Sequence, residues 1–421
     1  MSKILIVGGQ MENKGAQAMT FTVINEIKKR YPDKEILVNC IDPDRGYAFD
    51  IIKIGKKLKI EMLGGVFGTL GKLIPNAEHV NVTRSDMERI MKDTDMMIDI
   101  SGFALSSQFT IRHSVNYLVN IMLAKRYKVP MVLMPQSFGP FEYESKYKSV
   151  IMALIKKYIT YPTYIYARED EGMQFLSRFT TRNLKRSMDL VLQGSSAYDL
   201  NVLFKPGAYK PNARVDVQPN SVGIVPNVKT MKYGSREDLL QAYRKMTDHL
   251  LKSGKNVVLL RHSTEDLEIC KGIKQHYPND DRVVLLEDEY DCIEIHHILE
   301  QFEFIIASRY HSIIHAYKDG IPVLALGWAT KYQELLGRFG QKEYMFDVRD
   351  LAHVEREIER KIDLMIARRE EESEKIKAVT AEIQSRTIFN EVFGELPMTE
   401  QAKTETSAEL EDVENATLQI G

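Results

Sequence analysis

The chain has 421 residues, of which 44% are hydrophobic and 28% are charged, with a net charge of −2. This is the composition of a soluble globular protein, and the length suits two domains of ordinary size. A net charge so close to zero excludes a general attraction to nucleic acid or to anionic membranes, so any anion-binding site has to be local.

In the first half, short β-rich apolar runs alternate with amphipathic stretches, as in parallel sheets covered by helices on both faces. We predict strands over residues 4–7, 35–40, 96–100, 131–134 and 164–167. We predict helices over residues 15–30, 84–91, 114–127, 145–158 and 169–178. Residues 49–80 are less regular and rich in glycine, and we interpret them as an excursion from the sheet.

A second series of the same kind begins near residue 220. We predict strands over residues 221–225, 256–260, 283–286, 304–307 and 323–326, and helices over residues 235–252, 291–301 and 311–318. The segment between the two series is rich in Pro and Gly, which is typical of a linker. We therefore predict an N-terminal domain over residues 1–205, a linker over residues 206–219 and a C-terminal domain over residues 220–350.

Residues 351–396 form a predicted helical extension, in which one long charged helix runs through about residue 384 and packs back across both domains. Residues 397–421 are acidic and poor in apolar side chains, so we predict a disordered tail. The predicted fold class is α/β, with two doubly wound Rossmann-like domains facing a cleft, an arrangement called GT-B-like. In such sheets ligands bind outside the carboxyl ends of the strands.

The three cysteines, Cys40, Cys270 and Cys292, are far apart and share no metal-binding spacing. We therefore expect neither a disulfide framework nor a zinc site, which fits a reducing compartment. The N-terminal sequence lacks the features of a signal peptide, and no apolar run approaches the roughly 20 residues of a membrane span. These features favour a cytoplasmic location and leave open a peripheral contact with the inner face of a membrane.

The most informative strand end lies in residues 304–316. An apolar run stops at Ser308, Arg309 and His311 follow at once, and an apolar helical pattern begins at Ile313. Free backbone N–H groups and the helix dipole favour anions at such a point. Arg offers a planar fork that matches phosphate or carboxylate, and His can transfer protons near neutral pH.

Further cations come after other predicted strands. Arg168, Arg261 and Lys331 each lie at or shortly after a strand end, so several positive charges are expected along one cleft. Glu169 and Asp170 follow Arg168 and suit the first turn of a helix, which is the only role that they require. Cations gathered at several strand ends favour anion binding more than any single one does.

Asp99 ends another apolar strand. A carboxylate in that position is unfavourable unless it has a partner or a task. It could anchor the following loop by accepting hydrogen bonds from the amides after Ser101 and Gly102. It could also act as a general acid or base with a raised pKa.

Two turns should face the same edge of the sheet. The first follows the first strand and has glycines without the GxGxxG spacing, so a nicotinamide site is not favoured; it continues through Asn13 and Gly15. The second contains Gln136 and Ser137, whose side chains could hydrogen-bond a polar ligand or simply belong to a turn.

His311 and His315 have the i,i+4 spacing that can hold a metal on one helix face. No third ligand of recognisable spacing accompanies them, so we expect no metal and interpret His315 as a core residue. His296 and His297 are expected to form a pair on a helix surface.

Three stretches, in this order, resemble motifs of the polysaccharide pyruvyl transferase family: residues 13–16 (NKGA), residues 134–141 (MPQSFGPF) and residues 304–316. The resemblance spans roughly residues 1–340. It implies transfer of the enolpyruvyl carbon of phosphoenolpyruvate to two hydroxyls of one sugar, with formation of a cyclic ketal and release of phosphate. The implied acceptor is a sugar of a cell-surface polysaccharide or of its lipid-linked precursor, and no cofactor is implied.

The resemblance also implies roles for individual residues. Asp99 and His311 would carry the proton transfers, with acid and base unassigned, and His311 could instead bind the leaving phosphate. Arg168 and Arg309 would hold phosphoenolpyruvate. The loop through Asn13 and Gly15 would face the cleft with its backbone amides and help to bind substrate, as would Gln136, Ser137, Arg261 and Lys331. The family pattern has a Gly-Gly pair in the loop after Asp99, whereas this chain has Phe103 as the second residue of the pair.

Two alternatives stay open from the sequence. One is a GT-B glycosyltransferase, in which Arg309 and Lys331 clamp the diphosphate of a nucleotide sugar. The other is a non-catalytic protein of the same fold that binds a glycan or a phosphorylated ligand, which the departure at Phe103 would fit. The acceptor sugar, its linkage and the oligomeric state are not determined by the sequence.

Overall fold

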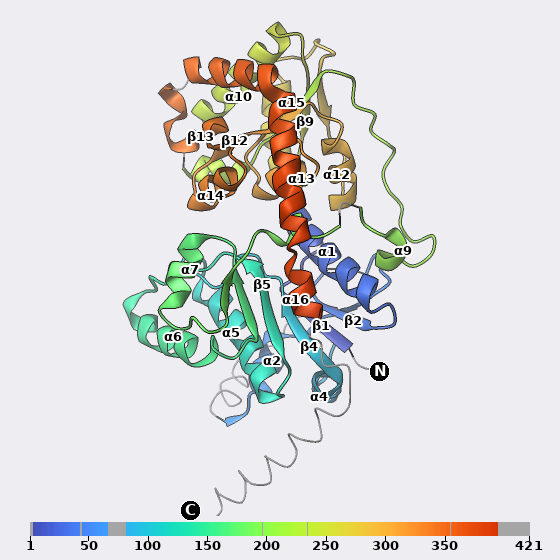
Figure 1. Cartoon of the computed structure of the whole chain (residues 1–421), viewed down its shortest axis with the longest axis vertical. Coiled ribbons are helices and arrows are strands. Elements are labelled where there is room, and N and C mark those ends of the chain that lie inside the picture. Colours follow the sequence, from blue (N-terminus) through green and yellow to red (C-terminus); the bar gives the residue numbers. More distant parts are fainter. Residues whose placement is uncertain are drawn as a thin grey trace, which may run out of the picture.

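The computed structural model describes residues 3–42, 44–65, 81–195, 197–233, 235–353 and 355–394. Two parallel β-sheets, each covered by helices, lie one above the other along the long axis of the molecule (Figure 1). We call the first sheet with helices α1 to α9 the N-terminal lobe, and the second sheet with helices α10 to α14 the C-terminal lobe. The predicted acidic tail lies outside the described residues.

The N-terminal sheet has the strand order β3-β2-β1-β4-β5-β6-β7, and all its pairs are parallel. Its strands are β1 (Lys3–Val7), β2 (Glu35–Asn39), β3 (Asp50–Ile52), β4 (Thr94–Asp99), β5 (Met131–Gln136), β6 (Tyr164–Ala167) and β7 (Leu184–Arg186). Its helices are α1 (Lys14–Arg30), α2 (Lys56–Glu61), α4 (Arg84–Asp93), α5 (Ile111–Arg126), α6 (Ser145–Tyr158), α7 (Asp170–Ser177), α8 (Leu190–Gln193) and α9 (Leu200–Leu203).

Alternation along the strands divides this sheet between two cores. Ile4 and Ile6 of β1 pack in the cluster that includes α1, whereas Leu5 and Val7 pack in the cluster that includes α4, α5 and α6. Successive side chains of a strand point to opposite faces, so the near-continuous apolar sequence of β1 reflects burial on both sides.

The C-terminal sheet has the order β10-β9-β8-β11-β12-β13 and is also parallel. Its strands are β8 (Ser221–Val225), β9 (Asn256–Leu260), β10 (Val283–Leu286), β11 (Phe304–Ala307), β12 (Val323–Gly327) and β13 (Met345–Asp347). Its α-helices are α10 (Arg236–Lys252), α11 (Leu267–Lys274), α12 (Cys292–Leu299), α13 (Tyr310–Lys318) and α14 (Thr330–Arg338). Short 3-10 helices cover Val228–Lys232, Thr264–Asp266, Lys342–Tyr344 and Val348–His353.

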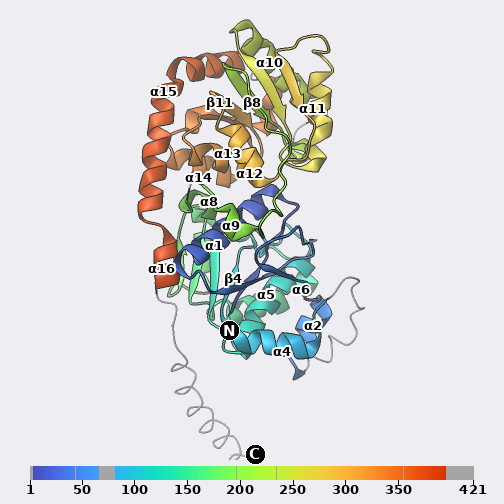
Figure 2. The same ribbon diagram turned by 90° about the vertical axis from the view of Figure 1, so that its right-hand side faces the viewer.

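The C-terminal helices cross from one lobe to the other. Helix α15 (Glu355–Ser385) packs on α10 and α13, and α16 (Ile388–Gly394) then contacts α1 of the N-terminal lobe (Figures 1 and 2). The Tyr166 hydroxyl donates to Glu391 Oε2 at 2.7 Å, and Arg30 Nη2 donates to Asn390 Oδ1 at 2.7 Å. The predicted long helix packing across both units is therefore confirmed.

All ten predicted strands are present, and the predicted fold class is confirmed. The interpretation of residues 49–80 as an excursion from the sheet was wrong in part, because β3 pairs in parallel with β2. The strands missed from the sequence are β3, β7 and β13, which have three residues each and lie at sheet edges. Three residues are too few to display the alternation on which the prediction rests.

Within the described residues, no helix combines the length and the apolar character that crossing a membrane demands.

Candidate active site between the two sheets

The two lobes meet where the N-terminal ends of helices α1, α13 and α14 approach the carboxyl ends of the strands. Gly15, in the first turn of α1, lies against the imidazole of His311, so closely that a Cβ at Gly15 would be 2.2 Å from His311 Nδ1. Lys14 Nζ also binds Glu289 Oε1 of the C-terminal lobe at 2.8 Å. Only glycine allows the imidazole to approach the α1 backbone in this way.

Arg168, which follows β6, is the centre of a buried polar cluster. Its Nη1 donates to Asp189 Oδ2 at 2.7 Å, and its Nη2 donates to Ser137 Oγ at 2.7 Å. Its Nε donates to Glu169 Oε1 at 2.9 Å, and Ser137 Oγ donates to the same oxygen at 2.9 Å. Burial alone would lower the pKa of Arg168, but Glu169, Tyr310 and Asp189 raise it above its usual value, so the guanidinium stays charged.

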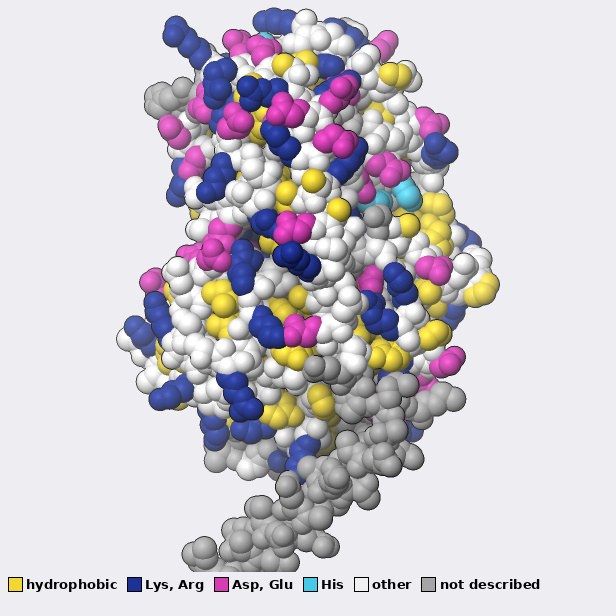
Figure 3. Space-filling model, viewed as in Figure 1, with side chains coloured by type: hydrophobic (Ala, Val, Ile, Leu, Met, Phe, Trp, Pro, Cys, Tyr) yellow, Lys and Arg dark blue, Asp and Glu magenta, His cyan; other side chains and the backbone are white. Residues whose placement is uncertain are grey.

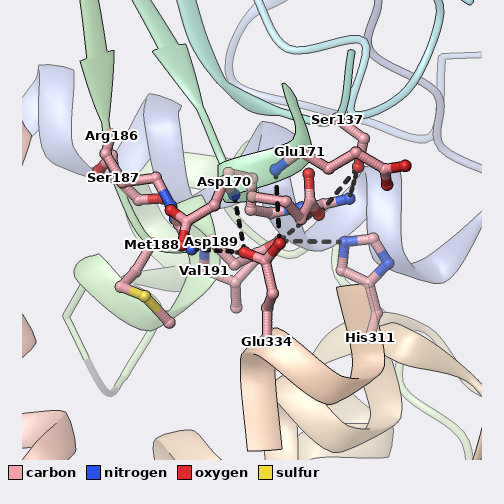
Figure 4. Close-up of polar contacts among 12 residues, drawn as sticks. Ser137, Asp170, Glu171, Arg186, Ser187, Met188, Asp189, Val191, His311 and Glu334 are labelled. Atoms are coloured by element: carbon pink, nitrogen blue, oxygen red, sulfur yellow. Dashed lines mark hydrogen bonds and ion pairs between the residues drawn. The ribbon is translucent and has the colours of Figure 1, made fainter. Parts of the chain in front are cut away.

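His311 from the C-terminal lobe faces this cluster. Its Nε2 lies 3.9 Å from Asp189 Oδ2, and 19% of its side chain is exposed (Figure 4). Asp189 also holds the short helix α8 through Oδ1, which accepts from the Val191 amide at 3.0 Å. Burial lowers the pKa of His311 to about 4, with Arg168 also lowering it and Asp189 opposing the shift. The imidazole is therefore neutral near pH 7.

Lys331, in the first turn of α14, supplies a second cation at the same place. Its Nζ lies 5.0 Å from the ring centre of Tyr310, and the Arg168 guanidinium lies 4.6 Å from that ring. Burial lowers the pKa of Lys331 to about 8; Arg168 lowers it further, while Glu169 and Asp189 act in the opposite direction. Within the described part of the chain, Lys331 forms no ion pair with a carboxylate. It is therefore the cation of this group best placed to accept an anion.

Asp99 ends β4, two strands from Arg168 in the sheet. Its side chain is fully buried; Oδ1 accepts from the Ser101 amide at 2.9 Å and from Gln136 Nε2 at 3.4 Å. Oδ2 has no hydrogen-bond partner among the described residues. Burial raises the pKa of Asp99 to about 6, although the Ser101 and Gln136 hydrogen bonds and Lys59 act against the shift. Asp99 thus anchors its loop and is also a carboxyl group that can hold a proton near neutral pH.

A family model for polysaccharide pyruvyl transferases matches residues 13–330 of this chain. The chain belongs to this family. The match covers all the site residues described so far except Lys331, and it begins at the cap of α1.

Solved structures of similar fold include UDP-GlcNAc 2-epimerase from Neisseria meningitidis bound to UDP-GlcNAc, with a TM-score of 0.54, 12% identity, and coverage of 94% of this chain and 99% of that chain. MnaA of S. aureus with UDP has a TM-score of 0.51, 11% identity and 92% coverage of each chain. HepE of Anabaena with UDP has a TM-score of 0.51, 13% identity, and coverage of 93% and 98%. Likeness at this level shows the GT-B fold alone.

In this member of the pyruvyl transferase family, two predicted anion-binding residues are held within their own lobe. Arg309 donates from Nε to Asp266 Oδ2 at 2.8 Å and from Nη2 to Asp266 Oδ1 at 2.6 Å, and it also binds Glu265. Arg261 Nε donates to the Asp288 carbonyl at 3.1 Å. Because Asp266 is fully buried, its charge requires a partner such as Arg309. The structure therefore groups Arg168, His311 and Lys331, whereas it holds Arg309 in ion pairs with Asp266 and Glu265 and Arg261 in a contact with a backbone carbonyl.

The remaining predicted residues shape the turns. Asn13 Oδ1 caps α1 by accepting from the amides of Gly15 at 3.1 Å and Ala16 at 3.2 Å. Gln136 and Ser137 lie between Asp99 and Arg168 at the end of β5, and each binds one of them. Thus Asn13 and Gly15 position a helix end, whereas Gln136 and Ser137 connect the two charged side chains.

Two sequence interpretations of side chains were wrong. Glu169 is more than a first-turn acid, because it is buried as the ion-pair partner of Arg168 and makes no capping hydrogen bond. His296 is buried rather than on a helix surface, since α12 is covered by both α1 and α13; its neighbour His297 is exposed. The prediction that His315 is a core residue is confirmed, as it has no exposed surface.

Asp189 and Tyr310 were not singled out from the sequence. An acid directly before the apolar run 190–192 is the signature of a helix cap, and this signal could have drawn attention to Asp189. Tyr310 carries no such signal, because its value lies in packing between two cations. Among the described residues, no three His, Cys, Asp or Glu side chains are grouped so as to hold a metal ion.

Proposed function

We propose that the protein transfers the pyruvyl group of phosphoenolpyruvate to two hydroxyls of one sugar in a cell-surface polysaccharide or its lipid-linked precursor. The observation that carries the proposal is the meeting of Arg168, His311 and Lys331 at the carboxyl edge of the N-terminal sheet. Phosphoenolpyruvate brings about three negative charges. Arg168 and Lys331 supply the positive charge at this place, and His311 is neutral near pH 7. The N-termini of α13 and α14 also point to this region, and neither has a side-chain cap.

The reaction requires protonation of the methylene carbon of phosphoenolpyruvate. The central carbon then becomes an oxocarbenium-like cation, and the first sugar hydroxyl adds to it as it gives up its proton. Departure of phosphate restores the cation, and the second hydroxyl adds with loss of its proton. The products are a cyclic ketal and inorganic phosphate. The two hydroxyls lose one proton each, of which the methylene carbon gains one and the departing phosphate takes up the other.

His311 is the group that we propose accepts the proton of the attacking hydroxyl. Its lowered pKa makes it neutral, and Asp189 beside it stabilises the imidazolium that forms. The same proposal makes Asp99 the acid, since its raised pKa lets a fraction of the carboxyl group stay protonated near neutral pH. Asp99 is fully buried, so direct transfer to the methylene carbon requires the loop at Ser101 and Gly102 to move aside.

The second candidate, a glycosyltransferase, rests on the fold that the protein shares with enzymes crystallised with UDP or UDP-GlcNAc. In a glycosyltransferase, Arg309 would have to bind the diphosphate of the nucleotide sugar, yet its guanidinium already binds Asp266 and Glu265. Arg168 is paired with Glu169 and Asp189 in the same way, so the ion pairs alone do not separate the two functions. The family match is what favours pyruvyl transfer.

The test measures phosphate release from phosphoenolpyruvate with a panel of 4-nitrophenyl hexosides, together with NMR detection of the ketal methyl group in the sugar product. Parallel thermal-shift runs use phosphoenolpyruvate and UDP-GlcNAc separately. We expect stabilisation by phosphoenolpyruvate and formation of the ketal. Stabilisation by UDP-GlcNAc alone, with UDP release, would establish the glycosyltransferase instead.

A further inference from the structure

Helices α5 and α6 lie side by side on the N-terminal lobe and carry positive charge without negative charge. Residues 111–126 contain three Lys or Arg residues, residues 145–158 contain four, and neither helix has an Asp or Glu. The whole chain has a net charge of −2, so the excess of positive charge on the two helices is local. Two exposed acids, Glu142 and Glu144, lie just before α6, and Glu144 pairs with Lys146 at 3.1 Å. We call the exposed side of the two helices the basic face; its cations are Arg112, Lys125, Arg126, Lys146, Lys148, Lys156 and Lys157. Figure 3 shows Lys and Arg side chains along the left-hand edge of the N-terminal lobe, where α6 lies.

Contacts at both ends hold the two helices together. Lys125 of α5 and Lys157 of α6 lie 5.7 Å and 5.5 Å from the ring centre of Tyr158. At the other end, the hydroxyls of Ser114 in α5 and of Tyr143, two residues before α6, are 2.8 Å apart in a buried contact. The two helices therefore pack together, and their cations Lys125 and Lys157 meet at Tyr158.

Large apolar side chains are exposed among these cations. Tyr147 is 40% exposed and Val150 is 61% exposed on α6, and Phe109, just before α5, is 40% exposed. They are three of the seven large hydrophobic side chains that are exposed in the described residues. Tyr147 and Val150 are three residues apart, so they lie on one side of the helix, and Lys146 Nζ is 4.7 Å from the Tyr147 ring centre.

The basic face reaches the candidate active site through Phe109. The rings of Phe109 and Phe103 are 4.9 Å apart in an edge-on contact. Phe103 forms a backbone bridge with Ser137, and the Ser137 amide donates to the Gly102 carbonyl at 2.9 Å. Ser137 in turn binds Arg168. One continuous path of contacts thus leads from the exposed aromatic side chain to the polar cluster around Arg168.

We propose that the basic face docks on an anionic membrane surface and places the cleft beside it. Lysines around exposed aromatic and aliphatic side chains on a helix lying at the surface are the arrangement that inserts into the headgroup region of anionic lipids. A soluble polyanion would satisfy the lysines but would leave Val150 without an apolar partner. That the membrane presents a lipid-linked sugar to the cleft rests on the proposed function, whereas the docking itself does not.

The experiment is co-sedimentation of the full chain with vesicles of phosphatidylcholine alone or mixed with phosphatidylglycerol. We expect binding to the mixed vesicles only, weaker at high salt. Lys146→Glu combined with Lys148→Glu should reduce the apparent affinity roughly tenfold or more, since each lysine contributes separately near an anionic surface. Val150→Ser should weaken the binding that persists at high salt. The matched control is Lys210→Glu combined with Lys252→Glu, an equal charge change at exposed sites away from the basic face, which should have little effect.

Equal sedimentation with both kinds of vesicle, or equal losses in the test and control pairs, would overturn the proposal. Binding to dextran sulfate but not to the mixed vesicles would overturn it in favour of a soluble polyanion. Turnover of phosphoenolpyruvate with a water-soluble hexoside separates this inference from the proposed function. The Lys146 and Lys148 variant should keep that turnover. Vesicle binding by a chain that shows no turnover would contradict the proposed function and leave the docking proposal standing.

Discussion

Glu334 of α14 caps the N-terminus of α7 across the boundary between the lobes, through the backbone of Asp170. The Asp170 amide donates to Glu334 Oε2 at 2.7 Å, and Arg186 Nη2 donates to the same oxygen at 3.1 Å (Figure 4). Arg186 Nε also binds Asp170 Oδ1 at 2.8 Å. A carboxylate of the C-terminal lobe therefore accepts hydrogen bonds from a helix N-terminus and from a guanidinium of the N-terminal lobe, beside the Arg168 cluster. This contact joins the two lobes.

Glu334→Gln should weaken this contact between the two lobes. The amide keeps the size of the side chain but loses the charge that both the helix end and Arg186 attract. We expect a loss of about 1 kcal/mol in the free energy of unfolding, because the contact is partly exposed, and a broader distribution of lobe separations in small-angle X-ray scattering. Glu382→Gln is the matched control, since it removes an ion pair with Arg338 on the same α14. Equal scattering from the two variants would show that Glu334 does not hold the lobes.

Arg309→Ala should destabilise the fold by about 3–5 kcal/mol, because it leaves the buried carboxylate of Asp266 without its partner. Urea unfolding of Arg309→Ala, Asp266→Asn and the double variant measures the coupling. The double variant should lose much less than the two single losses added together. If Arg309→Lys folds normally but no longer binds phosphoenolpyruvate, Arg309 leaves Asp266 for the substrate, and the role implied by the family resemblance would be restored.

The histidine at the centre of the site should make the fold sensitive to acid. The pKa of His311 is lowered to about 4, mainly by burial, against an ordinary value near 6.5. The unfolded chain therefore binds this proton first, so His311 costs no stability above about pH 6.5 and disfavours the native state as the pH falls towards 4. Asp99 has a raised pKa and acts in the opposite sense, so only a difference between variants isolates His311.

We expect His311→Gln to remove that part of the acid sensitivity. Relative to this variant, the native chain should lose up to about 1.4 kcal/mol of unfolding free energy per pH unit between pH 6.5 and 4. Chemical denaturation at a series of pH values measures the difference, and His297→Gln provides an exposed histidine as the control. A constant difference across that range would mean that His311 titrates normally in the native state.

The strand ends show what the sequence could predict about the site. Asp99, Gln136 and Arg168 each follow a long apolar run, and those runs became the adjacent strands β4, β5 and β6. Their common edge was therefore predictable from the pattern. The preference of Arg309 for Asp266 was not, because the two are 43 residues apart and meet only when β9 and β11 flank β8.

The contacts across the boundary between the lobes could not be predicted from the sequence either. Asp189 faces His311 across it, and Glu334 reaches Asp170 from 164 residues away. Such pairs depend on how two complete lobes pack, whereas periodicity reports only which face of each element is buried.

Asp99→Asn is the variant on which the proposed mechanism depends. The amide preserves the shape of the side chain, and its oxygen can still accept from the Ser101 amide, so the loop should keep its position. Only the titrating proton is lost. General acid–base catalysis typically contributes a factor of about 10²–10⁴, so kcat should fall by about that much. Affinity for phosphoenolpyruvate should hold or improve, because an ionised carboxylate repels an anionic ligand.

Measuring kcat and phosphoenolpyruvate binding for Asp99→Asn across pH distinguishes catalysis from structure. If Asp99 is the acid, the wild-type rate should fall as the pH rises through about 6, where the carboxyl group loses its proton. The variant should lose this dependence and retain the one due to His311. Normal turnover by Asp99→Asn would mean that Asp99 only anchors the Ser101 loop. The proton would then have to come from another group at the site. Lys331, whose pKa is lowered to about 8, is the next group to test.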